Sequence, residues 1–196
     1  MVKKKLLIIG DGGHARSCID VIENNKNFKI YGIISGSKKN VGKKIFNYKV
    51  IGTDKDLKKL KKKVKYAHVA LGSIGGTFLR EKLFNKLKKL KFSLPIIKSN
   101  KSHISKYAQI GEGTIIMHGA IINANSKIGY NCILNSNSLI EHDCEIGNHS
   151  QVSTGAILNG SVTLGSRSFI GSRSVVKNNC KLKSKTFLKM GTVYKG

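Results

Sequence analysis

A period of six residues runs through the second half of this chain. Beginning at Ile104, every sixth residue is Ile, Leu or Val. The positions are Ile104, Ile110, Ile116, Ile122, Ile128, Leu134, Ile140, Ile146, Val152, Leu158, Leu164, Ile170, Val176, Leu182 and Leu188. A six-residue period matches neither the 3.6-residue period of an α-helix nor the two-residue period of a flat strand. It fits a chain that turns a corner every six residues, so that about 18 residues close a triangular coil. We therefore predict a parallel β-helix of almost five coils, with these aliphatic side chains inside.

A second position of the repeat is also restricted. The residue four places after each aliphatic residue is no larger than Cys or Thr, with Val162 as the exception. We expect it to point inward where the wall bends. Cys132, Cys144 and Cys180 occupy this position, so we interpret them as small buried hydrophobic residues. The chain has no C-x-x-C pair, and neither disulfides nor zinc–thiolate sites are expected.

The first half of the chain follows a different pattern, in which strands alternate with helices. Such alternation predicts a parallel sheet covered by helices on both faces. We expect strands at 4–10, 28–35, 48–53, 66–72 and 93–98, and helices at 15–23 and 77–90. The prediction is an α/β Rossmann-like domain over 1–98 followed by an all-β parallel β-helix over 99–196.

A glycine-rich loop follows the first predicted strand. Residues Gly10 to Gly13 would present backbone N–H groups at the start of a helix, where phosphate binds well. His14 follows Gly13 directly, and the second strand ends in Ser35 and Gly36 without an acid for a ribose hydroxyl, so NAD is not expected. A nucleotide or sugar phosphate fits better. The alternative is a tight turn that holds no ligand.

The chain is strongly basic, with 36 Lys and Arg against 10 Asp and Glu and a net charge of +26. Only four of these are Arg, whereas nucleic-acid recognition relies on Arg and aromatic residues. We expect the charge to steer an anionic ligand such as a nucleotide or coenzyme A, and we expect no nucleic-acid partner. No apolar segment approaches the roughly 18 residues of a membrane span, and the apolar run near the start is too short for a signal peptide. We expect a cytoplasmic protein.

The stretch IEHDCEIG, residues 140–147, gathers scarce acidic residues around one histidine. Glu141, Asp143 and Glu145 are three of only four acids from residue 101 onward, and they surround His142. The pKa of histidine lies near neutrality, which suits a general base, and an adjacent carboxylate can fix its tautomer and stabilise the imidazolium. His142 lies two places after inward Ile140, so it should be exposed at a corner. We predict His142 as the base, oriented by Asp143 or by Glu141.

The short α/β part with GDGGHA at residues 10–15, joined to hexapeptide repeats that carry IEHDC, resembles the NeuD/PglD family of sugar acetyltransferases over essentially the whole chain. The resemblance implies a left-handed β-helix that forms homotrimers. It implies that acetyl-CoA, the co-substrate, lies between neighbouring β-helices and that the N-terminal domain holds the sugar.

The resemblance also assigns residues. His142 matches the catalytic base and Asp143 the adjacent acid. Gly12, Gly13 and His14 match the loop that contacts the sugar, and Gly10 begins this loop. Gly160 falls where the backbone contacts coenzyme A. Two positions depart from the family: Ser35-Gly36 replaces an acidic pair that contacts the nucleotide, and Gln151 stands where some members have a second histidine.

We therefore predict an acetyl-CoA-dependent N-acetyltransferase that acts on a nucleotide-linked amino sugar for surface glycan or nonulosonic acid synthesis. The alternatives are O-acetylation of a sialic-acid-type sugar, an acyl carrier protein as donor, and a non-catalytic β-helical scaffold. No metal is expected; the alternative is zinc held by His118, His142 and His149 across a trimer interface. Lys177, Lys181, Lys183 and Lys185 are candidates for coenzyme A phosphates, or else form a solvated basic end.

Overall fold

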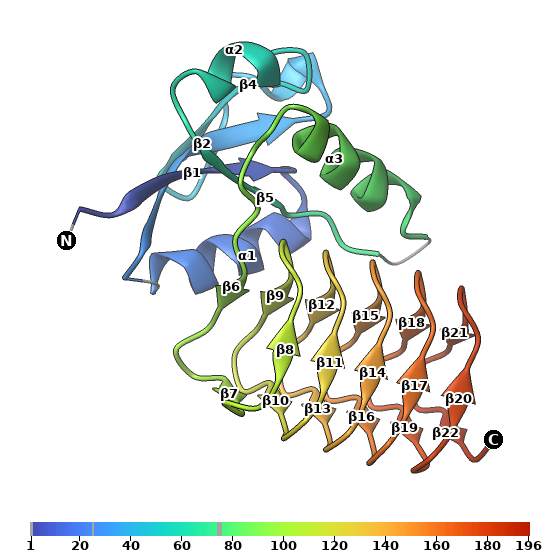
Figure 1. The fold of residues 1–196 in the computed structure, drawn as a ribbon. Coiled ribbons are helices and arrows are strands. Elements are labelled where there is room, and N and C mark those ends of the chain that lie inside the picture. The colour runs from blue at the N-terminus through green and yellow to red at the C-terminus, as the bar shows by residue number, and fades with distance from the viewer. Residues whose placement is uncertain (1, 25, 74–75) are drawn as a thin grey trace. The chain divides into compact units, whose positions relative to one another are not determined.

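The computed structural model describes residues 2–24, 26–73 and 76–196, and the chain divides into two compact units (Figure 1). Unit 1 comprises residues 1–72 and 78–95, and unit 2 comprises residues 73–77 and 96–196. Among the described residues, no helix is both long enough and apolar enough to cross a bilayer.

Unit 1 is a five-stranded sheet with helices on both of its faces. The sheet order is β3-β4-β2-β1-β5, parallel throughout except that β3 runs antiparallel to β4. The strands are β1 (Lys4–Ile9), β2 (Phe28–Ser35), β3 (Lys44–Ile45), β4 (Tyr48–Thr53) and β5 (Tyr66–Val69). The helices are α1 (Gly13–Glu23), α2 (Leu57–Lys61) and α3 (Phe78–Lys89), with a 3-10 turn η1 (Lys38–Asn40). Helix α1 covers one face of the sheet, and α2 and α3 cover the other (Figure 1).

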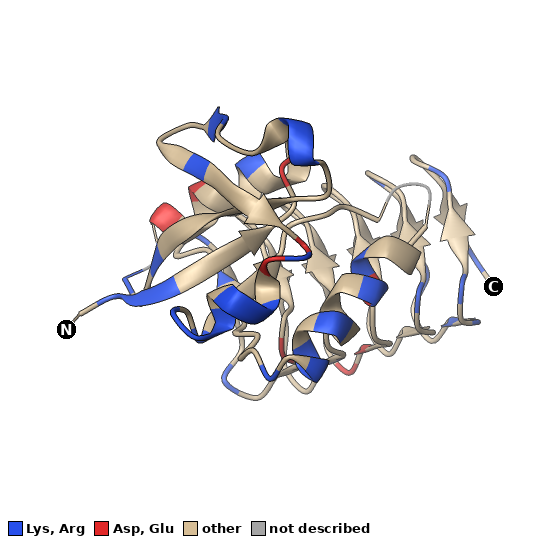
Figure 2. Cartoon of the chain, turned by 90° about the horizontal axis from the view of Figure 1, so that it is seen from above, with Lys and Arg blue, Asp and Glu red and all other residues tan. Residues whose placement is uncertain are grey.

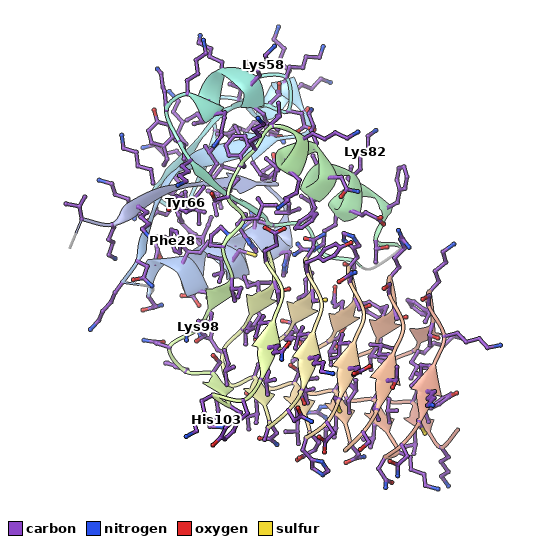
Figure 3. The ribbon with its side chains drawn as sticks, viewed as in Figure 1. Phe28, Lys58, Tyr66, Lys82, Lys98 and His103 are labelled. Carbon is purple, nitrogen blue, oxygen red and sulfur yellow. The ribbon has the colours of Figure 1, made fainter. Side chains whose placement is uncertain are left out.

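The buried side chains of β1 reflect its place inside the sheet, between β2 and β5. Leu6, Leu7, Ile8 and Ile9 are at most 1% exposed, because helices cover both faces. Lysines point away from this core, as Lys58 on α2 and Lys82 on α3 illustrate (Figure 3). The predicted α/β pattern is confirmed, while the two-residue strand β3 was not anticipated.

Unit 2 is a triangular prism built from two-residue strands (Figure 1). Its three faces are parallel sheets, which we call faces 1, 2 and 3. Face 1 contains β7 (His103–Ile104), β10 (Ile121–Ile122), β13 (Leu139–Ile140), β16 (Ile157–Leu158), β19 (Val175–Val176) and β22 (Val193–Tyr194). Face 2 contains β8 (Gln109–Ile110), β11 (Lys127–Ile128), β14 (Glu145–Ile146), β17 (Thr163–Leu164) and β20 (Lys181–Leu182). Face 3 contains β6 (Ile97–Lys98), β9 (Ile115–Ile116), β12 (Ile133–Leu134), β15 (Gln151–Val152), β18 (Phe169–Ile170) and β21 (Phe187–Leu188).

Successive coils stack in register, each residue pairing with the residue 18 places later. On face 1, for example, Ile122 pairs with Ile140, and Ile140 pairs with Leu158. The aliphatic residues of the repeat fill the interior together with buried Cys132 and Cys144. The predicted six-residue repeat and β-helix are therefore confirmed, and the fold is consistent with a left-handed β-helix.

Each corner of the prism from Gly113 to Gly191 contains a residue in the left-handed backbone conformation. Positive φ angles recur every six residues at Gly113, Gly119, Asn125, Asn131, Asn137, Asp143, His149, Gly155, Ser161, Arg167, Arg173, Asn179, Lys185 and Gly191. Gly and Asn adopt this conformation at the least steric cost. Backbone hydrogen bonds between coils offset the cost at the other residues. Asp143 N–H, for instance, donates to the Ala124 carbonyl at 3.1 Å.

Candidate active site

His142 lies at the corner where face 1 turns into face 2, between β13 and β14. Its side chain is 61% exposed, as the hexapeptide register predicts for a corner position. Nδ1 of His142 lies 2.7 Å from Oδ2 of Asp143. An ionised carboxylate only accepts hydrogen bonds, so this contact places the imidazole proton on Nδ1. The lone pair of Nε2 is then available to take a proton from a substrate.

Each carboxylate of the IEHDCEIG stretch has its own partner from the preceding coil. Asn125 Nδ2 donates to Asp143 Oδ1 at 2.6 Å, and Asn123 Nδ2 donates to Glu141 Oε2 at 2.9 Å. Glu145 accepts from Lys127 Nζ at 3.1 Å. Of the three acids, Asp143 is the one whose carboxylate contacts the His142 ring among the described residues. The geometry therefore favours Asp143 over Glu141 as the group that orients the histidine.

The Asp143 carboxyl group is held in its charged form. The hydrogen bond from Asn125, followed by the hydrogen bond from His142, lowers the pKa of Asp143 below its usual value. A charged carboxylate beside the imidazole would stabilise the imidazolium that forms when Nε2 takes a proton. The pair therefore has the chemistry of a general base with an orienting acid.

Gly160 lies directly beside the His142 ring, one coil further along. A Cβ atom at Gly160 would stand 2.7 Å from both Cε1 and Nε2 of His142, which is closer than real Cβ contacts. The glycine thus leaves room for the ring at this corner. Its expected contact with coenzyme A stays a prediction.

The glycine-rich loop of unit 1 has the predicted place at the carboxyl end of β1. Gly10 has φ +119°, and a Cβ there would lie 2.5 Å from Leu71 Cδ1. Gly12 is the N-cap residue of α1, and Gly13 is the first residue of the helix. The structure therefore gives these glycines the backbone roles that the sequence predicts, whereas their contact with a sugar remains a prediction.

A cavity of about 320 Å³ opens beside this loop within unit 1. Its polar lining comes from the ends of three neighbouring strands: Gly10, Asp11 and Gly12 after β1, Gly36 after β2, and Asp54 after β4. The remaining lining is apolar, from Ile9, Ile34, Leu71, Leu79 and Leu83. Neither Gly13 nor His14 is among these lining residues.

Asp54 is a candidate residue that the sequence reasoning missed. The expected acid was sought after the second strand, where Ser35 and Gly36 stand. Strand β4 pairs with β2, so the residue after β4 reaches the same edge of the sheet. An acid directly after a parallel strand was the available signal.

His14 is half-buried in the first turn of α1. Burial and the nearby Arg80 guanidinium lower the pKa of His14 to about 4. Its ring is therefore neutral near pH 7. A neutral imidazole can donate or accept a hydrogen bond to a substrate, but it does not attract phosphate by charge.

The remaining candidate histidines of unit 2 lie on other corners. Nδ1 of His118 is 2.7 Å from Ser99 Oγ, at the corner between faces 3 and 1. His149 is 3% exposed at the corner between faces 2 and 3, and its Nδ1 is 2.8 Å from Asn131 Nδ2. Within the described part of the chain, no group of three His, Cys, Asp or Glu residues could hold a metal ion.

Gln151 occupies the position at which some members of the resembled family have a second histidine. The structure places it on face 3, with 4% of its surface exposed. Its Oε1 accepts from Ser73 N–H, and its Nε2 donates to Ser153 Oγ. Both ends of the amide are thus engaged within unit 2.

Basic residues are spread over the helices and strands of both units (Figure 2). Lys177, Lys181, Lys183 and Lys185 are exposed near the last coils. Acidic residues are few by comparison in Figure 2, in agreement with the composition. The phosphate-binding role of the four lysines stays a prediction.

Two family models match the chain. Residues 5–87 match the PglD N-terminal domain, and residues 107–142 match the bacterial transferase hexapeptide (six repeats). A comparison with curated proteins gives no match.

Several solved structures have the same fold along nearly their whole length. The acetyltransferase domain of PglB from Neisseria gonorrhoeae FA1090, in complex with acetyl coenzyme A, is 25% identical and superposes with a TM-score of 0.90, covering 99% of this chain and 92% of that one. A histidine-to-alanine variant of GDP-perosamine N-acetyl transferase from Caulobacter crescentus, in complex with CoA and GDP-perosamine, is 25% identical with a TM-score of 0.80, covering 95% and 93%. WeeI from Acinetobacter baumannii AYE, 18% identical with a TM-score of 0.74 and coverage of 96% and 93%, shares the fold.

Proposed function

The expected resemblance to the NeuD/PglD sugar acetyltransferases is confirmed in both halves of the chain, and from it we propose a reaction for this acyltransferase. It transfers acetyl from acetyl-CoA to the amino group of a nucleotide-linked amino sugar. The observation that carries this proposal is the His142–Asp143 pair, exposed at a prism corner with the proton on Nδ1. The similar structures support it, since one holds acetyl coenzyme A and another holds CoA and GDP-perosamine.

The His142–Asp143 pair supplies the proton transfers that this reaction needs. As the amine attacks the thioester carbonyl, Nε2 of His142 takes a proton from the attacking nitrogen. Asp143 stabilises the imidazolium formed in this step. The new C–N bond replaces the C–S bond, and the proton passes to the departing thiolate. The products are the acetamido sugar and free coenzyme A.

The cavity of unit 1 supports a nucleotide-linked acceptor. Backbone N–H groups at the start of α1 suit a phosphate, because the helix dipole adds partial positive charge there. The carboxylates of Asp11 and Asp54 can accept hydrogen bonds from ribose hydroxyls or from a base N–H. In the resembled family an acidic pair after the second strand contacts the nucleotide, and we assign this contact to Asp54 here. The apolar lining suits the faces of a base.

A row of apolar side chains on face 1 supports the homotrimer. The outward positions of adjacent coils hold Ile121, Leu139, Ile157 and Val175, stacked in register. Ile121 is 38% exposed, and the other three are partly exposed. We call these four residues the apolar strip. The strip runs beside the corner that carries His142, so a second copy packed on it would complete a cleft for the substrates.

Release of coenzyme A thiol tests the proposed reaction. Purified protein is mixed with acetyl-CoA and, separately, with nucleotide-linked amino sugars, free sialic-acid-type sugars and CMP-linked ones. We expect rapid release with an amino sugar. Release only with a sialic-acid-type sugar would replace this proposal with O-acetylation. No release from folded protein with acetyl-CoA or an acyl carrier donor would contradict acetyl transfer.

The base is tested by His142→Ala. We expect kcat to fall by about 10² to 10⁴, the usual contribution of a general base. The matched control is Asn178→Ala, two coils further along at the same corner position and also exposed. Near-native turnover of His142→Ala would remove His142 from the mechanism.

A further inference from the structure

We propose that Asn125 is a positioning residue for the acetyl transfer, holding Asp143 so that Asp143 fixes the His142 ring. The inference rests on the proposed function. It concerns a residue that lies outside the GDGGHA and IEHDC stretches and that touches no reacting atom. It accounts for how an orienting acid can be kept in place on an exposed corner.

The contacts form a continuous chain from the amide to the base. Asn125 Nδ2 donates to Asp143 Oδ1 at 2.6 Å, and Asp143 Oδ2 lies 2.7 Å from His142 Nδ1. Each oxygen of the carboxylate therefore has a separate partner. With Oδ1 held by the amide, rotation of the carboxylate would break a hydrogen bond to a charged group, which is stronger than a neutral one.

Stacking of the coils brings Asn125 and Asp143 together. They are 18 residues apart and occupy the same left-handed corner position, with φ angles of 60° and 59°. The Asp143 N–H also bonds to the carbonyl of Ala124, next to Asn125. The backbone thus fixes the Cα positions of both residues close together, so the short Asn125 side chain is long enough to contact the Asp143 carboxylate.

The exposure of the site is the reason such a residue is needed. The Asp143 side chain is 46% exposed, so water competes for its oxygens. A free carboxylate there would sample several rotamers, and the imidazole would lose its fixed tautomer. The neighbouring pair Asn123–Glu141 provides a comparison, because it has the same chemistry without a contact to the ring among the described residues.

The first experiment compares Asn125→Gly with Asn179→Gly. Glycine tolerates the positive φ at both positions, and Asn179 occupies the same corner two coils beyond Asp143 with φ 61°. We expect Asn125→Gly to lower kcat roughly tenfold with little change in the KM for acetyl-CoA, as loss of a partner behind a catalytic group does. Asn179→Gly should keep wild-type turnover. Equal effects of the two variants would overturn the proposal.

A double-mutant cycle separates positioning from general damage. Asp143→Gly also keeps the backbone conformation. If Asn125 acts through Asp143, adding Asn125→Gly to Asp143→Gly should leave kcat unchanged. Losses that multiply in the double variant would overturn the proposal.

A third measurement does not depend on turnover. Nitrogen-15 spectra of the His142 ring in the intact protein report which nitrogen carries the proton. We expect the Nδ1–H tautomer in the wild type and in Asn179→Gly, and a mixture of tautomers in Asn125→Gly. An unchanged tautomer in Asn125→Gly would overturn the inference. Because no substrate is present, this result stands even if the thiol assay contradicts acetyl transfer.

Discussion

At the scale of single residues, the absence of a side chain at Gly160 is as important to the site as the presence of His142. The ring occupies the space that a Cβ at Gly160 would take. The Nε2 atom, which would accept the substrate proton, is one of the two nearest ring atoms. The orientation of the base therefore depends on a residue of the next coil.

We predict that Gly160→Ala impairs catalysis more than stability. The new methyl group must push the exposed ring away from its position, since the contact would be 2.7 Å. A misplaced base costs on the order of 10² in rate, as small displacements of reacting groups do. The melting temperature should stay within about 2 °C of wild type, because the displaced group is an exposed side chain. Unchanged kcat would show that the ring is not held at Gly160 during turnover.

One buried and one half-buried histidine in unit 1, His68 and His14, should make the protein sensitive to acid. His68 is fully buried, and neither of its ring nitrogens has a hydrogen-bond partner among the described residues. Burial, Arg80 and His14 lower the pKa of His68 well below 6.5, and the pKa of His14 falls to about 4. Below pH 6.5 these two histidines bind more protons in the unfolded chain than in the folded protein. The free energy of unfolding therefore falls as the pH falls.

We predict that the free energy of unfolding falls as the pH is lowered from 6.5 to about 4. Denaturant titrations at several pH values measure this change. Replacing the ring by His68→Leu should reduce this loss. Exposed His103→Leu on β7 is the matched control and should keep the wild-type pH dependence. The lowered pKa values of Asp56 and Asp143 affect stability only below about pH 4, so they fall outside this window. Equal pH dependence in His68→Leu and wild type would contradict the assignment.

The sequence was sufficient to predict the exposed corner position of His142, because the hexapeptide register sets which side chains point inward. It was not sufficient for Asn125 or Asp54. The Asn125 contact joins residues 18 apart and depends on side-chain direction. The place of Asp54 depends on which strand pairs with β2. The local hydrophobic pattern of a sequence does not predict the order of strands in a sheet.

At the scale of elements, the prism is built on a column of glycines at the edge of face 2. A Cβ at Gly111, Gly129, Gly147 or Gly165 would lie between 2.3 and 2.4 Å from an atom of the next coil. For Gly111, Gly147 and Gly165 that atom is a backbone nitrogen. These glycines differ from Gly160, whose neighbour is a flexible ring.

We predict that Gly147→Ala destabilises the β-helix by about 2–3 kcal/mol, the range for inserting an atom where nothing can yield. The backbone of Ser166, 2.4 Å from the new Cβ, can move only if the coils separate. Thermal and denaturant unfolding followed by circular dichroism measure the change. Gly160→Ala serves as the control, with the same substitution 13 residues further along the chain at another corner. A Gly147→Ala protein as stable as that control would show that the coils are loosely stacked.

The predicted strand at 93–98 does not form as one element. Ser93 makes an isolated parallel bridge with Tyr66 in unit 1, whereas Ile97 pairs with Ile115 in unit 2. Pro95 lies between them and has no N–H to donate to a ladder. A short apolar run gives no sign of which sheet it joins, so its two ends could not be assigned from the sequence.

At the scale of the whole molecule, we propose that a second copy of the chain completes the site. The apolar strip of face 1 borders the His142 corner, whereas face 2 presents polar residues such as Lys127, Glu145 and Thr163 at its outward positions. Partly exposed aliphatic residues in a continuous row are typical of a surface that packs on another protein.

We predict that Ile157→Glu abolishes self-association and lowers turnover, because a carboxylate on the apolar strip would be buried without a partner. Light scattering coupled to size-exclusion chromatography measures the mass. Thr163→Glu places the same charge on face 2, one strand further along the same coil, and should remain a trimer. A monomeric wild type, or a trimeric Ile157→Glu protein, would contradict this interface.

Because the coils repeat strictly every 18 residues, the position of a residue along the prism axis is fixed by its number in the sequence. Each additional coil moves a corner by one strand spacing, about 4.8 Å, and leaves the contacts of the other coils unchanged. The distance between the His142 corner and the end of the prism is therefore set by the number of residues in between, in whole steps. Insertion or loss of one coil beyond Gly160 would change this distance by one step and leave the contact between His142 and Asp143 as it is. In such a fold, the length of the prism can change in evolution without a change in the residues that carry the proton transfer.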